Sequence, residues 1–424
     1  MNADTTTPCN GSRGGKQTLV PPCQRGNGQC MGEKPAKEDV GWRRIVRNFT
    51  PSWFAVNMGT GIVSILIHQL PYNASWLKSI AVAFFVLNIL LFVIFTGITI
   101  VRYTLYPEIW SAMIRHPVQS LFLGCFPMGL ATIINMTVFV CADWGDWAIY
   151  LAWALWWFDV VLAVMCSILL PFPVMHHHKL ELNRMTAALL FPFVPAIVAS
   201  SSGGIIAAAL PSQSHALTTL VASYIIWGMG EFFAMIVLTI YFHRLCMHSL
   251  PPREVIVSVF LPIGPLGQGG FGIQQLGIVA RTLLPETGAL GGSGGDSSSS
   301  AVVGEVFYGV GMFLAFVMWG AGLAWLGFAL ISIAVTQSFP FNMGWWGFTF
   351  PLGVLATCTG LMAKELDSSF FRVLTMVFSI SVFLLWLVVA MRTLLMVISG
   401  ELFFAPCLQD LRRKAAQADA DRTA

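Results

Sequence analysis

Charged residues are scarce in this sequence: Lys, Arg, Asp and Glu make up 10% of its 424 residues, while hydrophobic residues make up 56%. A typical soluble domain is about 25% charged. So few charges exclude an ordinary soluble protein and predict an all-α protein that crosses the membrane several times. The net charge of +3 reflects how Lys and Arg are divided between the two sides of the membrane, and gives no sign of a nucleic-acid partner.

Motifs for enzymatic chemistry are also missing. The sequence has no P-loop, HExxH or nucleophile-elbow pattern, so we expect neither an enzyme nor an ATP-driven pump, and no cofactor. His176, His177 and His178 share a loop with Lys179. Because adjacent histidines rarely complete a closed metal site, we expect a solvated basic loop and no metal.

Ten hydrophobic segments are each near or above the roughly 20 residues that cross a bilayer core. An even number places both termini on one side. The first segment follows some 48 mostly polar residues, so we expect no cleavable signal peptide. The ten predicted spans are 50–70, 76–101, 119–140, 146–172, 186–210, 215–242, 254–282, 303–335, 341–363 and 370–398.

The positions of Lys and Arg predict which side the termini occupy. Eighteen of the 23 fall in the two tails and in the loops after even-numbered spans, and basic residues concentrate on the cytoplasmic side of membrane proteins. Both termini are therefore predicted to be cytoplasmic. Residues 1–41 are predicted to be a disordered tail, 42–400 the membrane domain with a flexible outer loop at 283–304, and 401–424 a second cytoplasmic tail.

A short pattern recurs along the chain. Phe-Pro, an apolar residue, Gly and then small or hydroxyl residues occur at 126–132 and 350–357, with looser copies elsewhere. A repeat of about 70 residues indicates two spanning helices with their connections. Successive prolines are 65 to 89 residues apart, and the longest interval contains a Gly/Ser run: Pro51, Pro127, Pro192, Pro262 and Pro351.

Odd-numbered and even-numbered spans differ in composition. Odd spans carry these prolines and clusters of Gly, Ser and Thr, whereas even spans are bulky and aromatic, as at Trp156-Trp157. Proline-broken backbone is tolerated in a membrane only against protein or a water-filled cavity. We therefore predict five helical hairpins in a quasi-fivefold arrangement, with odd helices around a central pore. The alternative is that small residues only allow tight helix packing.

The centres of the odd spans lack charge, which favours an anion path, because a cation path more often shows rings of Asp or Glu. Helix kinks are predicted at Pro127, Pro192, Pro262 and Pro351. The candidate pathway residues are neutral and hydrogen-bonding: Asn57, Thr60, Thr132, Asn135, Ser200, Ser201, Gln268 and Thr357.

Buried ionisable residues in a span are functional candidates, and the sequence offers few of them: His68, Asp159, Glu231, Glu305 and Arg392. Asp159, Glu231 and Arg392 lie on even spans, behind the predicted pore. This position favours pairing between helices over a direct role in transport.

Several segments together resemble the tellurite-resistance/dicarboxylate transporter family, which includes plant slow anion channels. They are the Trp-Trp-x-Phe-x-Phe-Pro-Leu stretch at 345–352 and the Trp-Gly-x-Gly pattern at 227–230 and 319–322. Residues 48–62 and 70–72 look most like those of the fungal sulfite efflux pumps within this family. The resemblance covers roughly residues 42–400.

The resemblance implies a quasi-fivefold pore blocked by a phenylalanine on the ninth helix, which we match to Phe350, with Phe348 as the alternative. It also implies a homo-oligomer, a dimer or trimer, in which each protomer has its own pore. The expected function is export of sulfite or bisulfite across the plasma membrane. The alternatives are a malate-like dicarboxylate transporter, which would want a fixed Arg in the pore, and a general anion channel.

Overall fold

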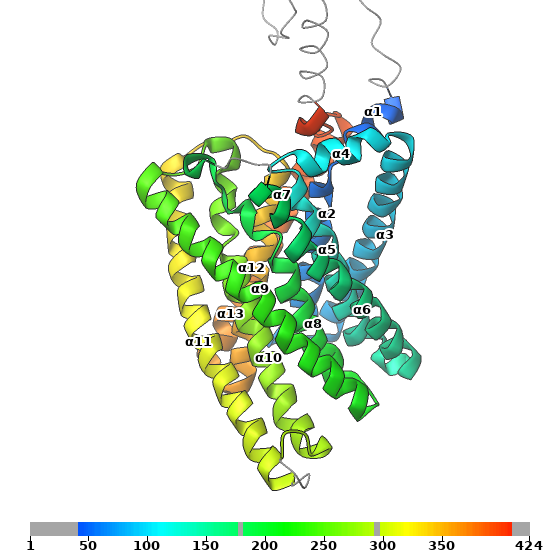
Figure 1. Cartoon of the computed structure of the whole chain (residues 1–424), viewed down its shortest axis with the longest axis vertical. Helices are drawn as coiled ribbons and strands as arrows, with labels where there is room; N and C mark the ends of the chain where they lie inside the picture. Colours follow the sequence, from blue (N-terminus) through cyan, green and yellow to red (C-terminus); the bar gives the residue numbers. More distant parts are fainter. Residues whose placement is uncertain (1–40, 177–180, 292–296, 409–424) are drawn as a thin grey trace, which may run out of the picture.

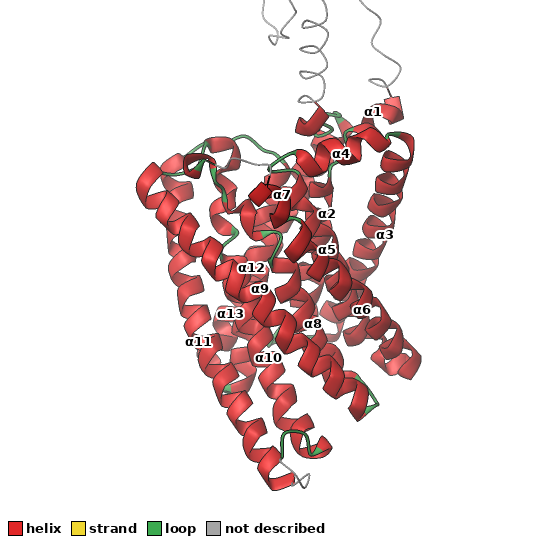
Figure 2. Cartoon of the chain, in the orientation of Figure 1, coloured by secondary structure: helices red, strands yellow, loops and turns green. Residues whose placement is uncertain are grey.

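The structure is a computed structural model that describes residues 41–176, 181–291 and 297–408. Within these ranges all regular structure is helical (Figure 2), which confirms the all-α prediction. The predicted disordered tail, apart from Gly41, and residues 409–424 of the second tail lie outside the described residues, as do His177 and His178.

The chain is built from five helical hairpins. Each hairpin begins with a 3-10 segment that leads into a buried helix. The paired helices are α2 (Phe54–His68) and α3 (Ser75–Leu105), α5 (Cys125–Cys141) and α6 (Asp146–Leu169), α8 (Val194–Ala209) and α9 (Gln213–His248), α10 (Ile263–Thr287) and α11 (Ser297–Thr336), and α12 (Thr349–Glu365) and α13 (Ser369–Ile398). The 3-10 segments are Pro51–Trp53, Ser120–Gly124, Ala187–Leu190, Arg253–Phe260 and Met343–Phe348. The short helices α1 (Gly41–Arg47), α4 (Pro107–Arg115) and α7 (Pro171–His176) lie outside this repeat.

The first helices of the five hairpins form a closed ring. α2 packs on α5, α5 on α8, α8 on α10, α10 on α12, and α12 returns to α2. Their burial agrees with this position: 94% of an apolar stretch within Arg253–Thr287, which contains α10, is buried, against 17% for α3 and 22% for α13. The prediction that the odd helices lie inside and the even helices outside is therefore confirmed.

Length and composition support a membrane protein. Within the described residues, eight helices are long and apolar enough to cross a membrane, and a ninth span is possible if α1 and α2, bent by 85° from each other, are counted together. α8 has only 16 residues. The count of ten crossings therefore stays a prediction.

Four of the five repeated prolines lie where a 3-10 segment passes into its α-helix, whereas Pro51 begins its 3-10 segment. Pro127 and Pro351 occupy the first turns of α5 and α12, and Pro192 and Pro262 lie just before α8 and α10. Proline lacks a backbone N–H, and N–H groups in the first turn have no intrahelical acceptor. The prolines predicted as kinks thus mark one end of each buried helix, where they cost no hydrogen bond.

The predicted loop 283–304 is shorter in the structure, because helix α10 continues to Thr287 and α11 begins at Ser297. Pro285 lies inside α10. The helix ends at Gly288, whose φ of 63° is left-handed, a conformation that glycine adopts at little cost. The predicted boundaries were wrong because Gly and Ser composition does not fix where a helix ends.

The two ends of the described chain meet at one end of the molecule (Figure 1). The Arg44 guanidinium donates to the Gly400 carbonyl (3.2 Å), and the Ala405 N–H donates to Asn48 Oδ1 (3.1 Å). The rings of Trp53 and Phe403 stack with centroids 5.3 Å apart. The first residues of the predicted C-terminal tail, up to 408, are therefore folded against the helices.

Candidate functional site

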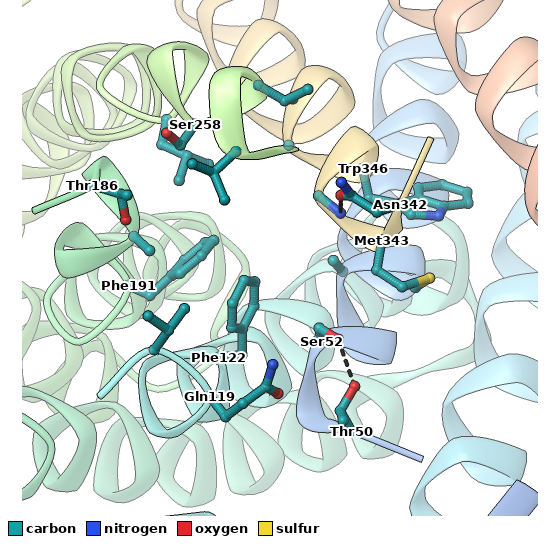
Figure 3. Close-up of a pocket in the computed structure, with 18 of the residues that line it drawn as sticks. Thr50, Ser52, Gln119, Phe122, Thr186, Phe191, Ser258, Asn342, Met343 and Trp346 are labelled. Atoms are coloured by element: carbon teal, nitrogen blue, oxygen red, sulfur yellow. Dashed lines mark hydrogen bonds between the residues drawn. The ribbon is translucent and has the colours of Figure 1, made fainter. Parts of the chain in front are cut away.

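The helix ring encloses a cavity of about 640 Å³ at the end where the chain ends meet, which we call the near cavity. Side chains from all five repeats line it, and Phe122 and Phe191 project into it with ring centroids 5.0 Å apart (Figure 3). Its charged lining residues are Glu254 and Glu401. This cavity is mainly apolar with two carboxylates at its margin.

A second cavity of about 540 Å³, the far cavity, is lined by the opposite ends of the same five ring helices and by α13. Lys364 and Arg372 belong to its lining, and Arg372 pairs with the exposed Asp367. Thr357, Thr375 and Ser379 add hydroxyl groups. The far cavity is therefore more polar than the near one, and its charged lining residues are cationic.

A buried layer separates the two cavities. On each ring helix, the residues that line the near cavity and those that line the far cavity are separated by several residues that line neither. On α2, for example, Met58 lines the near cavity and Leu66 lines the far cavity. Residues three, four or seven apart share one helix face, so residues at these spacings from both linings lie in this gap, more than one on some helices. We select one residue per helix and call these five the septum, and all are buried: Ile62, Asn135, Val198, Gln268 and Val354.

Two of the predicted pathway residues, Asn135 and Gln268, belong to the septum, and a third, Ser201, is attached to it. The Gln268 side-chain amide donates to Ser201 Oγ, which links α10 to α8. Asn135 Oδ1 is buried without a hydrogen-bond partner in the described part of the chain. The septum is thus aliphatic apart from two neutral amides.

Phe350 and Phe348 have different surroundings. Phe350 lines the near cavity next to Pro351. Phe348 packs between helical segments, with its ring centroid 4.8 Å from that of Phe260 and 5.6 Å from that of Trp345. Of the two rings, only Phe350 borders a cavity.

Three predicted pathway residues instead hold helices together, and none of them lines either cavity. Asn57 Nδ2 donates to the Asn88 carbonyl (3.1 Å) and to Asn88 Oδ1 (3.0 Å), and Asn88 Nδ2 donates to Thr132 Oγ1 (3.0 Å). Trp386 Nε1 donates to Thr60 Oγ1 (3.1 Å). Asn88, which sequence reasoning missed, was detectable as an amide in the middle of an apolar even span.

The last two predicted pathway residues differ in position. Thr357 lines the far cavity, while its hydroxyl donates to the Val354 carbonyl (2.9 Å). Ser200 is fully buried, lines neither cavity, and its Oγ has no hydrogen-bond partner in the described residues. The structure therefore brings Thr357 to the candidate pathway and leaves Ser200 inside the helix packing.

The predicted pairing between helices is wrong for Asp159 and Glu231, and Arg392 is exposed. Asp159 on α6 and Glu231 on α9 are buried, and their carboxyl oxygens have no hydrogen-bond partner in the described part of the protein. Glu305, for which no pairing was predicted, forms an ion pair with Arg281 (2.7 Å) at the surface. Sequence position placed the two acids behind the ring helices, but it could not show which groups would face them.

Comparison with known proteins gives consistent results. A family model described as voltage-dependent anion channel matches residues 48–394. A sulfite efflux pump of Arthroderma otae is 48% identical over 88% of this chain and 96% of its own length. A sulfite efflux pump of Saccharomyces cerevisiae is 25% identical over 74% and 78% of the two chains, and a malic acid transport protein of Schizosaccharomyces pombe is 24% identical over 81% and 77%.

Proposed function

Because this chain belongs to the voltage-dependent anion channel family, we propose that it exports sulfite from the cell along the axis of its helix ring. The observation that carries the proposal is that the same five helices line two cavities, one toward each end of the ring. A path along the axis of the ring would join them. The similar sulfite efflux pumps support the choice of anion.

The driving force in this proposal is the membrane potential. With the cell interior negative, it favours anion exit by about 2.3 kcal/mol per charge per 100 mV. The protein would reside in the plasma membrane with both termini cytoplasmic, which the distribution of Lys and Arg supports. The near cavity would then face the cytoplasm. We also propose a homo-oligomer, a dimer or trimer, in which each protomer has its own path.

Purified protein in liposomes tests the substrate directly. Vesicles loaded with labelled sulfite should lose it faster than protein-free vesicles, and faster still with the potential negative inside. Cells lacking the gene should accumulate sulfite and become more sensitive to it. Unchanged efflux in both assays would refute the sulfite assignment.

Malate-like dicarboxylates are the second candidate, because Arg372 in the far cavity offers the fixed guanidinium that could bind a carboxylate in a bidentate manner. Arg372 lies on the outer helix α13 and already pairs with Asp367, so its guanidinium is less available to a substrate carboxylate. Labelled malate and labelled sulfite in the same vesicles separate the two. Preferred transport of malate would replace our proposal.

A further inference from the structure

The two cavities carry charges of opposite sign. Glu254 and Glu401 belong to the near-cavity lining, whereas Lys364 and Arg372 belong to that of the far cavity. The near cavity also includes His116, whose Nδ1 accepts the Val118 N–H (3.2 Å) and the Gln119 N–H (3.1 Å). Nδ1 of this ring is thus occupied by two backbone N–H groups and does not face the cavity as a donor.

Charge at the near cavity penalises a dianion more than a monoanion. Coulomb repulsion from a fixed carboxylate is proportional to the charge of the approaching anion, so Glu254 and Glu401 repel a dianion twice as strongly. Both side chains are exposed, and salt weakens this repulsion. The near cavity therefore imposes a modest preference for the singly charged species.

The septum imposes a much larger preference. Ile62, Val198 and Val354 offer no hydrogen bonds, and all five septum residues are buried. The solvation energy that an ion loses in a low-dielectric layer grows with the square of its charge. A dianion of equal radius thus loses about four times as much as a monoanion, and among the septum side chains there is no cation to compensate it.

The hydrogen-bonding groups of the septum suit an anion that also carries a proton. Gln268 presents an amide N–H₂ beside Ser201, and the buried Oδ1 of Asn135 is an acceptor without a partner in the described residues. Sulfite dianion has only acceptor oxygens and would face that Oδ1 unfavourably. Hydrogensulfite has oxygens that accept from Gln268 and an O–H that can donate to Asn135.

We propose that the species crossing the septum is hydrogensulfite, the singly charged protonated form, and that Gln268 and Asn135 select it. This inference rests on the proposed sulfite export. Deprotonated sulfite is excluded at the septum and re-forms by ordinary acid–base equilibrium after transport. The protein therefore moves one negative charge and one proton with each sulfur atom.

The charge carried per sulfur is measurable in the unmodified protein. Reconstituted protein is placed in a planar bilayer with a tenfold gradient of total sulfite, equal pH on both sides and impermeant counter-ions. A monovalent anion gives a reversal potential of about 59 mV and a divalent one about 30 mV. We expect about 59 mV at pH values below and above the hydrogensulfite titration midpoint, and about 30 mV at the higher pH would overturn the proposal.

The pH dependence of the conductance is a second test of which species is carried. At constant total sulfite, conductance should fall as the pH rises through that midpoint, because the monoanion is depleted. A conductance that rises with pH would mean that the dianion is carried. Absence of any sulfite-dependent current or efflux would instead remove the proposed function itself, so the two failures are distinguishable.

Variants on α10 test the role of Gln268. Gln268→Leu should lower hydrogensulfite conductance about tenfold or more, since a hydrogen bond to a charged group is lost. Gln274→Leu is the matched control: Gln274 is equally buried on the same helix, but its amide contacts Met312 Sδ (3.1 Å) and not a cavity. Equal conductance of the two variants per folded protomer would refute a selective role for Gln268.

Discussion

Two phenylalanines two residues apart illustrate how position in the fold assigns a role to a side chain. Phe350 borders the near cavity, while Phe348 is enclosed by aromatic neighbours. An apolar ring in a narrow path obstructs a hydrated anion by steric contact and by dewetting. Phe350 is therefore our candidate for the gate, and Phe348 a packing residue.

Phe350→Ala should raise basal sulfite efflux several-fold, because the ring obstructs the path. Both Phe350 and Phe348 are buried, so either substitution costs packing and the flux is compared per folded protomer. The measurement is labelled efflux from liposomes per folded protomer, with folding checked by size-exclusion chromatography in detergent.

Phe348→Ala serves as the control for the Phe350 variant. Removing a buried Phe from a core typically costs about 3–5 kcal/mol, so this variant should give less folded protein without a higher flux per protomer. Higher flux in Phe348→Ala with no gain in Phe350→Ala would assign the gate to the other ring.

At the scale of helices, small residues in the ring set how closely neighbours approach. A methyl group added at Gly61 of α2 would overlap Thr132 Oγ1 on α5 and Asn88 Nδ2 on α3. The same two side chains form the Asn57–Asn88–Thr132 hydrogen bonds. Close packing and buried polar contacts therefore occur at one point, where three helices meet.

Gly61→Ala should destabilise the protein by about 1–3 kcal/mol, the usual cost of overpacking a well-packed core, and should lower its thermal midpoint in detergent. Gly97→Ala on α3 is the matched control, because nothing lies within 4 Å of a methyl group added there. Equal midpoints for the two variants would show that the α2–α5 contact is looser than described.

At the scale of the whole molecule, the folded chain end and the near cavity occupy one side. Cys407 is buried near the Arg102 guanidinium, whereas Cys246, at the end of α9, is exposed. Burial raises the pKa of the Cys407 thiol, although Arg102 partly opposes this effect. A thiol that is both enclosed and protonated reacts slowly, because the thiolate is the nucleophile.

In a variant with Cys9, Cys23 and Cys30 replaced by Ser, a membrane-impermeant maleimide should label Cys246 and leave Cys407 unmodified. Labelling should require permeabilised cells if the near cavity faces the cytoplasm. Labelling of Cys246 in intact cells would reverse the proposed orientation. Fast reaction of Cys407 would show that residues 402–408 detach from the helices.

The sequence by itself determined the features that depend on repeated local chemistry. Scarce charge required a membrane protein, and the alternation of proline- and glycine-rich spans with aromatic ones separated inner from outer helices, since lipid tolerates only apolar surface and satisfied backbone. It could not determine which hydroxyl and amide groups face the axis. A rotation of a single helix by one residue, about 100°, redirects its side chains from the pore to a neighbour.

That choice was made by tertiary packing. Asn57, Thr60 and Thr132 carry the same chemistry as Asn135 and Gln268, but Asn88 and Trp386 on the outer helices bind their polar atoms. Only the closed ring brings Asn135 and Gln268, from distant hairpins, into one buried layer between the two cavities. The physical reason is that a buried polar group is stable where a partner meets it, and the partners come from helices far away in the sequence.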